Sequence, residues 1–328
     1  MGRRDASRSA VGYRVQKALF CPPESIHERM TRPHVGISIV TWNNYADTRE
    51  CLDSLLDVSY PNVDVVLVDN GSTDGSGDRL EEEYPSVDVV HTGENLGYAG
   101  GMNVGTREVL ERGVDYVWQL NNDVVVPDES LLTDLVETME ANPNVGMLTP
   151  LVKEYPNTDT VWFWKGSLDW QTGNADHAAV PSSIPEGLVF NDYIPNCSLL
   201  FPADVLESVG LLPEDYFLYY DDVEHAVRIA AAGYDLATDT TTEIYHKESK
   251  SSKGELGAMY SYYRARNMVV FARKFRDRVS DLFPLFFARW LVKQTGIRTY
   301  YRRSGGVRGL FEGVADGLRG KVGRGRYP

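Results

Sequence analysis

The stretch that decides the fold is Tyr116-Val117-Trp118-Gln119-Leu120-Asn121-Asn122-Asp123-Val124-Val125-Val126. Its first five residues are bulky and β-prone, as expected of a strand buried on both faces of an α/β domain. Asn121, Asn122 and Asp123 follow at the carboxyl end of that strand, where open α/β sheets bind their ligands. A carboxylate flanked by two amides and enclosed by apolar residues favours a hard divalent cation shared with a phosphate. An Asn-rich turn between two strands is the alternative interpretation.

Strands and helices alternate before this stretch. The pattern predicts strands at 35–42, 63–68 and 87–91. A helix is expected after each strand: the first at 46–58, the second ending near residue 84 and the third ending near residue 112. Strands separated by helices of this length predict βαβ units and a parallel sheet. Beyond Asp123 we expect a helix at 128–141, a strand at 145–152, and a hairpin formed by 161–164 and 168–170.

Polar loops follow the predicted strands. The first strand ends in Thr41-Trp42-Asn43-Asn44, the second in Asp69-Asn70-Gly71, and the loop after the third is Asn95 to Gly105. Because parallel strands end at one edge, we expect these loops and the Asn121 triplet to converge. The glycines of the third loop allow the backbone to approach a ligand, although a tight strand-to-helix connection would also need them. The sequence holds neither a P-loop nor a dinucleotide fingerprint.

A second acidic site is predicted where aromatic residues precede Asp221 and Asp222 at the start of a helix. The helix dipole alone favours acidic residues in a first turn. A carboxylate beside aromatic rings is also partly desolvated, which raises its proton affinity toward that of a general base. Further on, a strand ends in His246, which is either a further metal ligand or a structural histidine.

Cysteine use and apolar runs indicate the compartment. The three cysteines of this 328-residue chain lie far apart without CxxC spacing, which excludes a zinc site or a disulfide framework. The first thirty residues show no signal peptide, and no segment is long enough to span a membrane, so we expect a cytoplasmic protein.

Charge is distributed unevenly. The net charge is −14, yet residues 260–328 contain 16 Lys and Arg against 4 Asp and Glu, a net charge of +12 that leaves −26 for residues 1–259. The apolar run at 282–292 within this basic segment predicts an interfacial helix that contacts anionic lipids. A helix packed on the domain with a solvated basic face is the alternative. We therefore divide the chain into an irregular arm (1–33), an α/β domain (34–275, with halves 34–127 and 128–275) and a basic amphipathic extension (276–328).

Five motifs in family-like order and spacing carry a resemblance. They are Val35-Gly-Ile-Ser-Ile-Val-Thr-Trp-Asn43, Val68-Asp-Asn-Gly-Ser-Thr-Asp74, Asn95-Leu-Gly-Tyr-Ala-Gly-Gly-Met-Asn103, Leu120-Asn-Asn-Asp123 and Tyr220-Asp-Asp-Val-Glu224. Together they resemble the family 2 glycosyltransferases of GT-A fold, in the rhamnosyltransferase-like branch. The resemblance covers about residues 35–275.

The resemblance implies an inverting transferase that moves a sugar from a nucleotide-diphosphate donor to a hydroxyl group. Asp123 and His246 would bind Mg²⁺ or Mn²⁺, and Asp222 would be the base, with Asp221 as the alternative. Asn121 stands where the family's Asp-x-Asp motif has its first carboxylate, which leaves one metal-binding carboxylate. The residues implied to bind the donor are Thr41, Asn43, Asp69, Asn70, Asn95, Gly97, Asn103, Asn121 and Asn122.

The basic extension makes a polyprenol-linked saccharide at the cytoplasmic membrane surface the leading acceptor hypothesis, and no nucleic acid is expected as a partner. Two other functions stay open. One is a nucleotidyltransferase that makes the activated sugar, although Thr41-Trp42-Asn43-Asn44 stands where such enzymes have a Gly-rich loop with Arg and Lys. The other is a catalytically silent glycan-binding protein, if the missing carboxylate abolishes metal binding.

Overall fold

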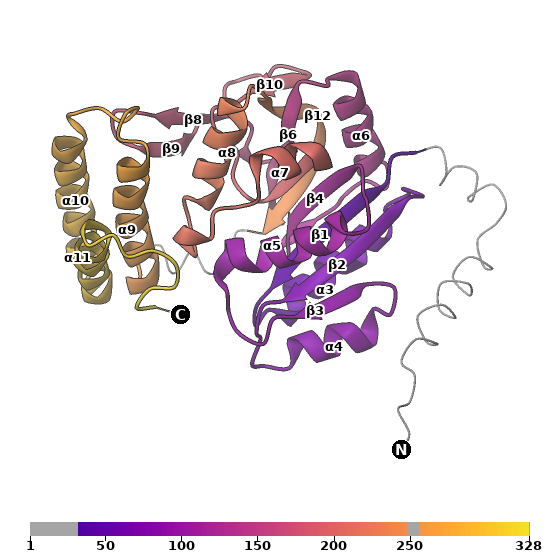
Figure 1. Ribbon diagram of the computed structural model, residues 1–328, viewed down its shortest axis with the longest axis horizontal. Helices are drawn as coiled ribbons and strands as arrows, with labels where there is room; N and C mark the ends of the chain where they lie inside the picture. The colour runs from indigo at the N-terminus through magenta and orange to yellow at the C-terminus, as the bar shows by residue number, and fades with distance from the viewer. Residues whose placement is uncertain (1–31, 248–255, 328) are drawn as a thin grey trace.

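The computed structural model describes residues 32–247 and 256–327. Most of the predicted irregular arm (1–33) therefore lies outside the described residues. Within them the four strands expected in the N-terminal half are present and parallel, in the order β3-β2-β1-β4 (Figure 1). These strands are β1 (Val35–Thr41), β2 (Val63–Asp69), β3 (Asp88–His91) and β4 (Tyr116–Asn121). Every residue of β1 is buried, as the apolar run predicts for a central strand covered on both faces.

The second half of the sheet is mixed. Next to β4 the order continues β11-β6-β12-β10, with β11 antiparallel to both neighbours and β12 parallel to β6. These strands are β6 (Val145–Tyr155), β10 (Leu188–Phe190), β11 (Ser198–Pro202) and β12 (Asp235–Lys247). The two-residue strand β5 (Val124–Val125) follows β4 and pairs antiparallel with the end of β12. The α/β class with a mostly parallel sheet is confirmed.

The predicted hairpin of residues 161–164 with 168–170 is wrong. β7 (Val161–Phe163) pairs with β6, and the hairpin is formed by β8 (Gly166–Asp169) and β9 (Asn174–His177). The Asp169 carboxylate accepts hydrogen bonds from Gln171 N and Thr172 Oγ1, both at 2.8 Å, and Gly173 has a φ of +67°. These are the features of a turn, so the chain reverses after Asp169 and the aromatic pattern misplaces the turn.

Helices cover both faces of the sheet. α5 packs on β1 and β2, whereas α6 and α8 both pack on β6 and β12. Gly105 lets α5 lie close to β1, because a Cβ there would be 2.3 Å from Ser38 Oγ. The helices of the domain are α3 (Tyr45–Leu56), α4 (Ser76–Glu83), α5 (Gly97–Leu110), α6 (Leu131–Ala141), α7 (Ala203–Val209) and α8 (Asp221–Ala231), with the short 3₁₀ helix η1 (Glu214–Tyr216).

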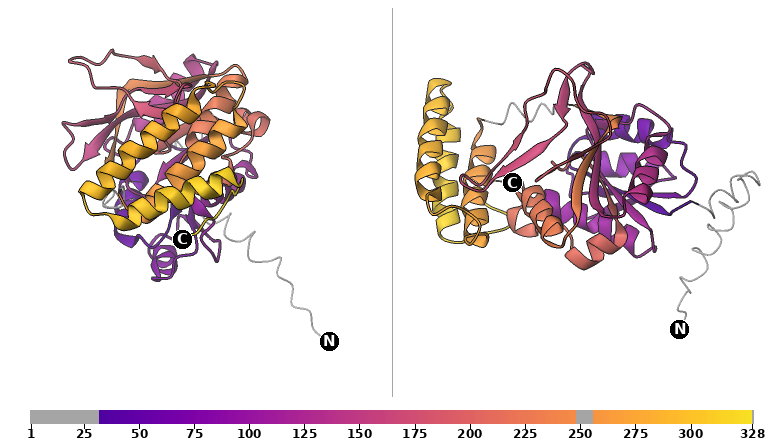
Figure 2. Two further views of the ribbon diagram at one scale, coloured as in Figure 1. Left: turned by 90° about the vertical axis from the view of Figure 1, so that its left-hand side faces the viewer. Right: turned by 90° about the horizontal axis from the view of Figure 1, so that it is seen from above.

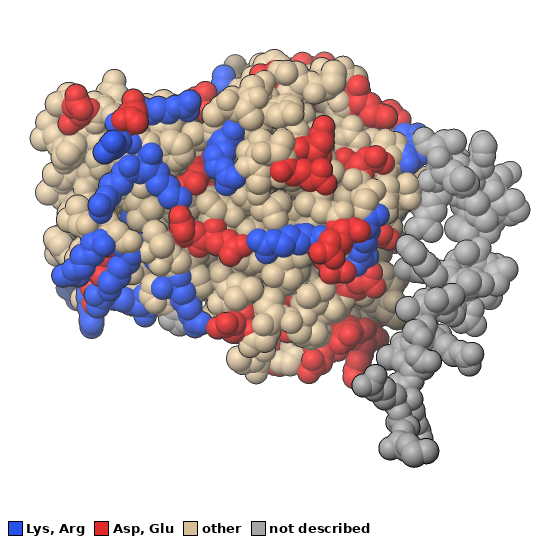
Figure 3. Space-filling view, viewed as in Figure 1, with Lys and Arg blue, Asp and Glu red and all other residues tan. Residues whose placement is uncertain are grey.

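Three C-terminal helices form a layer of their own at one end of the domain (Figure 2). They are α9 (Ala258–Lys274), α10 (Phe283–Tyr300) and α11 (Ser304–Leu318). α11 packs closely on α9, whereas α10 buries none of its apolar side chains. Lys and Arg side chains gather on this layer, and Asp and Glu on the domain (Figure 3). None of the helices among the described residues is long and apolar enough to cross a membrane.

Candidate active site

The stretch that decides the fold also places Asp123. The chain leaves β4 after Asn121, turns through Asp123 and enters β5. Because Val124 pairs with His246 on β12, the two side chains come together: His246 Nε2 lies 3.3 Å from Asp123 Oδ1. Both residues are less than 10% exposed. The ring of Trp162 packs on His246 with 4.6 Å between centroids, so the imidazole is held in place.

This pair fits a divalent cation. Among the described residues, Asp123 Oδ1 accepts no hydrogen bond and His246 Nδ1 has no hydrogen-bond partner. Ligands about 2.1 Å from one octahedral ion and at a right angle lie about 3 Å apart, close to the separation found here. No group of three His, Cys, Asp or Glu side chains suited to a metal occurs in the described part of the chain. Most coordination positions would therefore be left to water and to the oxygen atoms of a substrate.

The two asparagines before Asp123 shape the site from within. The Asn122 side-chain amide donates to Thr48 Oγ1 at 2.8 Å and to Thr41 Oγ1 at 3.2 Å. Thr41 is 1% exposed, so its hydroxyl lies inside this network. Asn121 Oδ1 accepts a hydrogen bond from the Tyr98 hydroxyl at 2.9 Å. In this structure Asn122 and Thr41 fix the turn that carries Asp123, and Asn121 positions Tyr98.

The loops after β1 and β2 meet at the same edge. Asn43 Oδ1 accepts a hydrogen bond from Thr73 N at 2.7 Å, which links the two loops. Asp69 is 6% exposed, its Oδ1 accepts from Ser72 N at 3.1 Å, and its Oδ2 lies 3.0 Å from His91 Nδ1. The structure thus brings Asn43 and Asp69 to neighbouring positions, as the convergence of parallel strand ends predicts.

The third loop is held by its own asparagines. Asn70 Nδ2 donates to Gly97 O at 2.9 Å, its Oδ1 accepts from Leu96 N at 3.0 Å, and Asn95 Oδ1 accepts from Gly97 N at 2.8 Å. Gly97 has a φ of +80°, and a Cβ there would lie 2.4 Å from Phe217 O. Gly97 is therefore required by the approach of the Phe217 backbone.

Asn103 lies apart from the residues above. It is 1% exposed, and its side-chain amide exchanges hydrogen bonds with the backbone of Leu212 at 2.8 and 3.1 Å and donates to Glu214 Oε1. These contacts hold α5 against the segment that leads into η1, so the Asn103 side chain is bound there and not to the loops after β1 and β2.

The acidic pair opens α8. Asp221 Oδ2 accepts from Asn196 Nδ2 at 2.8 Å, and Asp222 accepts from the Tyr193 hydroxyl. Burial raises the pKa of Asp222 to about 6, against the opposing effects of the Val223 N–H, the Tyr193 hydroxyl and the charge of Arg264. Burial, followed by the charge of Asp222, also raises the pKa of Asp221 well above its ordinary value. With a pKa of about 6, Asp222 is ionised at neutral pH and is the better candidate for a base.

Tyr98 and an aromatic wall join the two acidic sites. Burial raises the pKa of Tyr98 well above its ordinary value, and the charges of Asp221, Cys197, Asp222 and Asp123 raise it further. Ring contacts also run from one site to the other. They join His246 to Trp162, Trp162 to His177 (4.8 Å) and His177 to Tyr193 (6.3 Å), whose hydroxyl contacts Asp222.

Three residues of α9 belong to this site, although the sequence reasoning missed them. Arg264 lies beside Asp222 and over the ring of Tyr220 at 5.9 Å, and among the described residues its guanidinium makes no hydrogen bond or ion pair. Arg266 Nη2 donates to Tyr216 O at 2.6 Å. Asn267 Nδ2 donates to three backbone carbonyls, those of Tyr216, Leu218 and Tyr219, at 2.7 to 3.1 Å.

These α9 contacts hold an unusual loop. Phe217, Tyr219 and Tyr220 all have φ between 63° and 72°, a conformation that costs about 1 kcal/mol or more for each non-glycine residue. The loop leads directly into Asp221, so its shape sets the position of the acidic pair. The sequence signal was the polar cluster of Arg264, Arg266 and Asn267 between aromatic and aliphatic residues of the helix.

Comparison with known families agrees with this geometry. The model of glycosyl transferase family 2 matches residues 37–177. The chain carries a family 2 glycosyltransferase domain. The matched segment of this glycosyltransferase includes Asp69 and Asp123 and ends before the acidic pair and His246.

Relatives extend the likeness further along the chain. An N-acetylglucosaminyl-diphospho-decaprenol L-rhamnosyltransferase of Mycobacterium tuberculosis is 27% identical, over 58% of this glycosyltransferase and 68% of the relative. The low-salt glycan biosynthesis hexosyltransferase Agl10 of Haloferax volcanii is 22% identical, over 65% and 67%.

Solved structures show the same GT-A fold. The mannosyltransferase PcManGT from Pyrobaculum calidifontis, in complex with GDP-Man and Mn²⁺, has a TM-score of 0.55 at 21% identity, over 94% of this chain and 81% of that one. GalNAc-T7 with UDP, GalNAc and Mn²⁺ has a TM-score of 0.60 at 13% identity, over 76% and 50%.

Proposed function

We propose that this glycosyltransferase is a metal-dependent, inverting hexosyltransferase that moves a sugar from a nucleotide-diphosphate donor to a hydroxyl group of a glycan acceptor. The observation that carries the proposal is the buried Asp123–His246 pair, which ring contacts of Trp162, His177 and Tyr193 link to Asp222. A leaving-group site and a base in one site are what a single displacement at an anomeric carbon requires.

Asp123 and His246 would hold the Mg²⁺ or Mn²⁺. When bound, the ion stabilises the negative charge that develops on the departing diphosphate. The Asp123–His246 separation and the lack of a hydrogen bond to Asp123 Oδ1 among the described residues support this assignment, as does the Mn²⁺ in both related structures. Asn43, Asp69 and the Asn70–Asn95 loop would bind the nucleoside, since they lie at the ends of neighbouring strands.

Asp222 would remove the acceptor proton as the new bond forms. A pKa of about 6 leaves it ionised at neutral pH while its proton affinity stays high enough for catalysis. The Tyr193 hydroxyl orients it, and Arg264 offers a positive charge without a hydrogen-bonded partner to an anionic substrate. Because a single displacement takes place on the face opposite the leaving group, the anomeric configuration inverts.

The acceptor we propose is a polyprenol-linked saccharide, and the site of action is the inner face of the cell membrane. The name of the mycobacterial relative describes a decaprenol-linked acceptor, and the net charge of +12 over residues 260–328 suits an anionic surface. Flotation of the full chain and of a chain ending at residue 275 with anionic liposomes tests the membrane contact. Equal flotation of the two would contradict it.

Turnover of nucleotide sugars tests the reaction itself. A screen of donors by shift in melting temperature identifies the nucleotide, because a bound ligand raises stability by mass action. We expect Asp222→Asn to abolish transfer while donor binding persists, and EDTA to abolish transfer by the wild-type protein. Asp277→Asn, a change at a carboxylate whose side chain is 92% exposed, is the matched control. Near-full activity of Asp222→Asn would refute the base, and donor binding without turnover would favour the silent glycan-binding alternative.

A further inference from the structure

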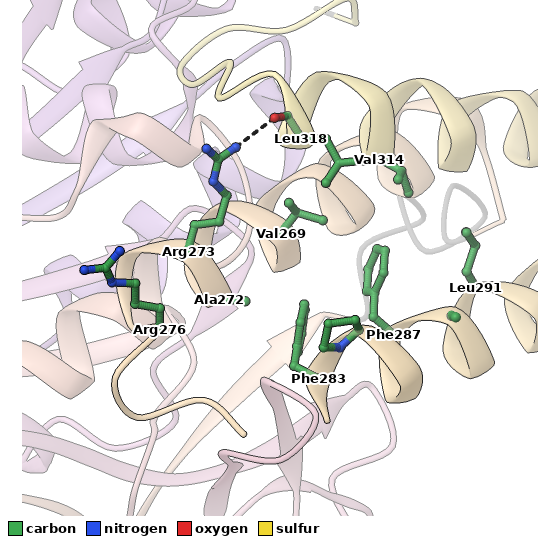
Figure 4. A pocket seen from close by; sticks show the side chains of 11 residues that line it. Val269, Ala272, Arg273, Arg276, Phe283, Phe287, Leu291, Val314 and Leu318 are labelled. Carbon is green, nitrogen blue, oxygen red and sulfur yellow. Dashed lines mark hydrogen bonds between the residues drawn. The ribbon is translucent and has the colours of Figure 1, made fainter. Parts of the chain in front are cut away.

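An apolar groove lies between the three C-terminal helices (Figure 4). Its volume is about 630 Å³, within the range of sites that bind small hydrophobic ligands. Two arginines, Arg273 and Arg276, lie at one end, and Leu291 lies toward the other. The apolar residues that line it are Val269, Ala272, Phe283, Pro284, Phe287, Ala288, Leu291, Val314 and Leu318.

The groove exists because α10 stands apart from the other two helices. α11 approaches α9 closely through glycines: a Cβ at Gly309 would lie 2.3 Å from Ala258 O, and one at Gly313 would lie 2.3 Å from Tyr262 O. In α10, by contrast, Arg298 is the buried residue, and the apolar side chains are half-buried or exposed. Stacked rings of Phe283 and Phe287, 5.5 Å apart, form one wall.

Positive charge is concentrated at the arginine end. Arg273 Nη1 donates to Leu318 O at 2.8 Å, which fixes its guanidinium beside the groove. The Arg276 side chain is 83% exposed, and its nearest acidic group is Asp277 at 3.7 Å. Residues 273–303 contain 9 Lys and Arg against 2 Asp and Glu. An elongated apolar ligand with an anionic head group matches this arrangement.

The groove also adjoins the segment that carries the acidic pair. The turn of the β8–β9 hairpin touches both: a Cβ at Gly173 would lie 3.5 Å from the Phe283 ring, and Gly173 O accepts a hydrogen bond from the Tyr220 hydroxyl at 3.0 Å. Tyr220 directly precedes Asp221. The hairpin turn therefore connects the groove wall at Phe283 with the segment that leads into the acidic pair.

We infer that this groove binds the isoprenoid chain of a polyprenyl-diphosphate-linked acceptor, with Arg276 and Arg273 facing its phosphates. The inference rests on the proposed function, because it identifies the acceptor of that reaction by its lipid. Binding energy comes from burial of the apolar chain, and the arginines select an anionic head group.

Binding measurements without sugar transfer test the groove separately from the reaction. The probes are geranylgeranyl diphosphate and geranylgeraniol, added to the full chain in detergent and measured by calorimetry. Ala288→Trp fills the groove from an exposed position, and we expect it to weaken both probes at least about tenfold. Arg276→Gln should weaken the diphosphate about tenfold and leave the alcohol unchanged.

Two variants serve as matched controls. Val292→Trp introduces the same side chain on α10 at a position that is 73% exposed and does not line the groove. Arg289→Gln removes a charge from α10 outside the groove. Both should bind the probes like the wild-type protein, and all four variants should keep the wild-type melting temperature.

Three results would overturn the inference. One is unchanged binding in Ala288→Trp. Another is displacement of geranylgeranyl diphosphate by phosphatidylglycerol at equal concentration, which would make the groove a phospholipid site. The third is a dimer in solution that Ala288→Trp dissociates, which would make it a contact between copies of the chain. Each of these results leaves the proposed transfer reaction untouched, because the assay involves no donor.

Discussion

Asp222→Asn should make the protein more stable as well as inactive. The Asp222 carboxylate is placed among Tyr193, Asp221 and aromatic side chains, and burial raises its pKa from 3.8 to about 6. The folded protein therefore holds the Asp222 proton more tightly than the unfolded chain does. Ionising the group in the folded state opposes folding, and an uncharged amide of the same shape removes that opposition.

The pH dependence of this effect follows from the same values. Below about pH 4 Asp222 is protonated in both states, so it causes no loss of stability. As the pH rises from about 4 to about 6, the unfolded state loses the proton first and the free energy of unfolding falls. A difference of one in pKa corresponds to about 1.4 kcal/mol, so the full loss is at most about 3 kcal/mol and is complete above pH 6. Asp222→Asn is expected to recover most of it.

Urea denaturation at pH 8 and at pH 4, in EDTA, measures this difference. We expect the variant to exceed the wild type by about 2 to 3 kcal/mol at pH 8 and to equal it near pH 4. Asp277→Asn, at an exposed carboxylate, should change stability by less than about 0.5 kcal/mol at either pH. A variant that is no more stable than the wild type at pH 8 would show that Asp222 is not held in a desolvated position, and the assignment of the base would lose its physical reason.

Two further predictions concern the same acid and the loop before it. The value of kcat/KM should rise as the pH rises through about 6, because Asp222 must be ionised to accept a proton. Below pH 6, kcat/KM should fall about tenfold for each pH unit. A kcat/KM that does not change between pH 5 and 7 would contradict this prediction. Asn267→Ala removes three hydrogen bonds to the loop before Asp221, so it should lower the free energy of unfolding by about 3 kcal/mol and reduce kcat. Asn267→Asp keeps the size of the side chain but lacks the amide donor, and it should have the same two effects. A wild-type kcat in both variants would show that the loop does not contribute to catalysis.

The sequence predicted the parallel half of the sheet and the meeting of its loops, because apolar runs and the geometry of parallel strands are local and general. It also placed Asp123, His246 and Asp222 in the candidate site, through the resemblance. It could not predict that Asn122 and Thr41 bond each other, because either side chain could equally face a ligand. It missed Arg264, Arg266 and Asn267, since a polar residue on a helix gives no sign of which distant loop it contacts.

The turn of the hairpin was misplaced for a related reason. Aromatic residues at 161–164 and 168–170 have equal strand propensity, and the hydrogen bonds of Asp169 that set the turn are visible only in the structure. Asn103 shows the same limit: its position in a glycine-rich motif suggested a ligand, whereas its amide is occupied by Leu212. Residue type predicts chemistry, and tertiary contacts decide whether that chemistry is available.

Electrostatics gives an independent reason for a cation at Asp123. The proposed donor carries a diphosphate, and the candidate site already holds Asp69, Asp123 and Asp222. Lys247 at the end of β12 is bound to Asp47 and Glu50 at 3.0 and 2.7 Å, so its charge is compensated. A unit negative charge about 6 Å from Asp123 is repelled by about 3 kcal/mol at an effective dielectric constant of 20. A divalent cation between Asp123 and the diphosphate attracts both and so replaces this repulsion with a net attraction.

Donor and metal should therefore bind cooperatively. With Asn121 in place of a second carboxylate, Asp123 and His246 alone should hold Mn²⁺ weakly, and the diphosphate oxygens supply the remaining ligands. By linkage, UDP, GDP or dTDP, whichever the protein binds, should raise its affinity for Mn²⁺ by the same factor as Mn²⁺ raises its affinity for the nucleotide. Water-proton relaxation by Mn²⁺ measures this, with nucleotide alone as the blank. Asp123→Ala should abolish the coupling, and equal Mn²⁺ affinity with and without nucleotide would show that the cation is not shared between protein and donor.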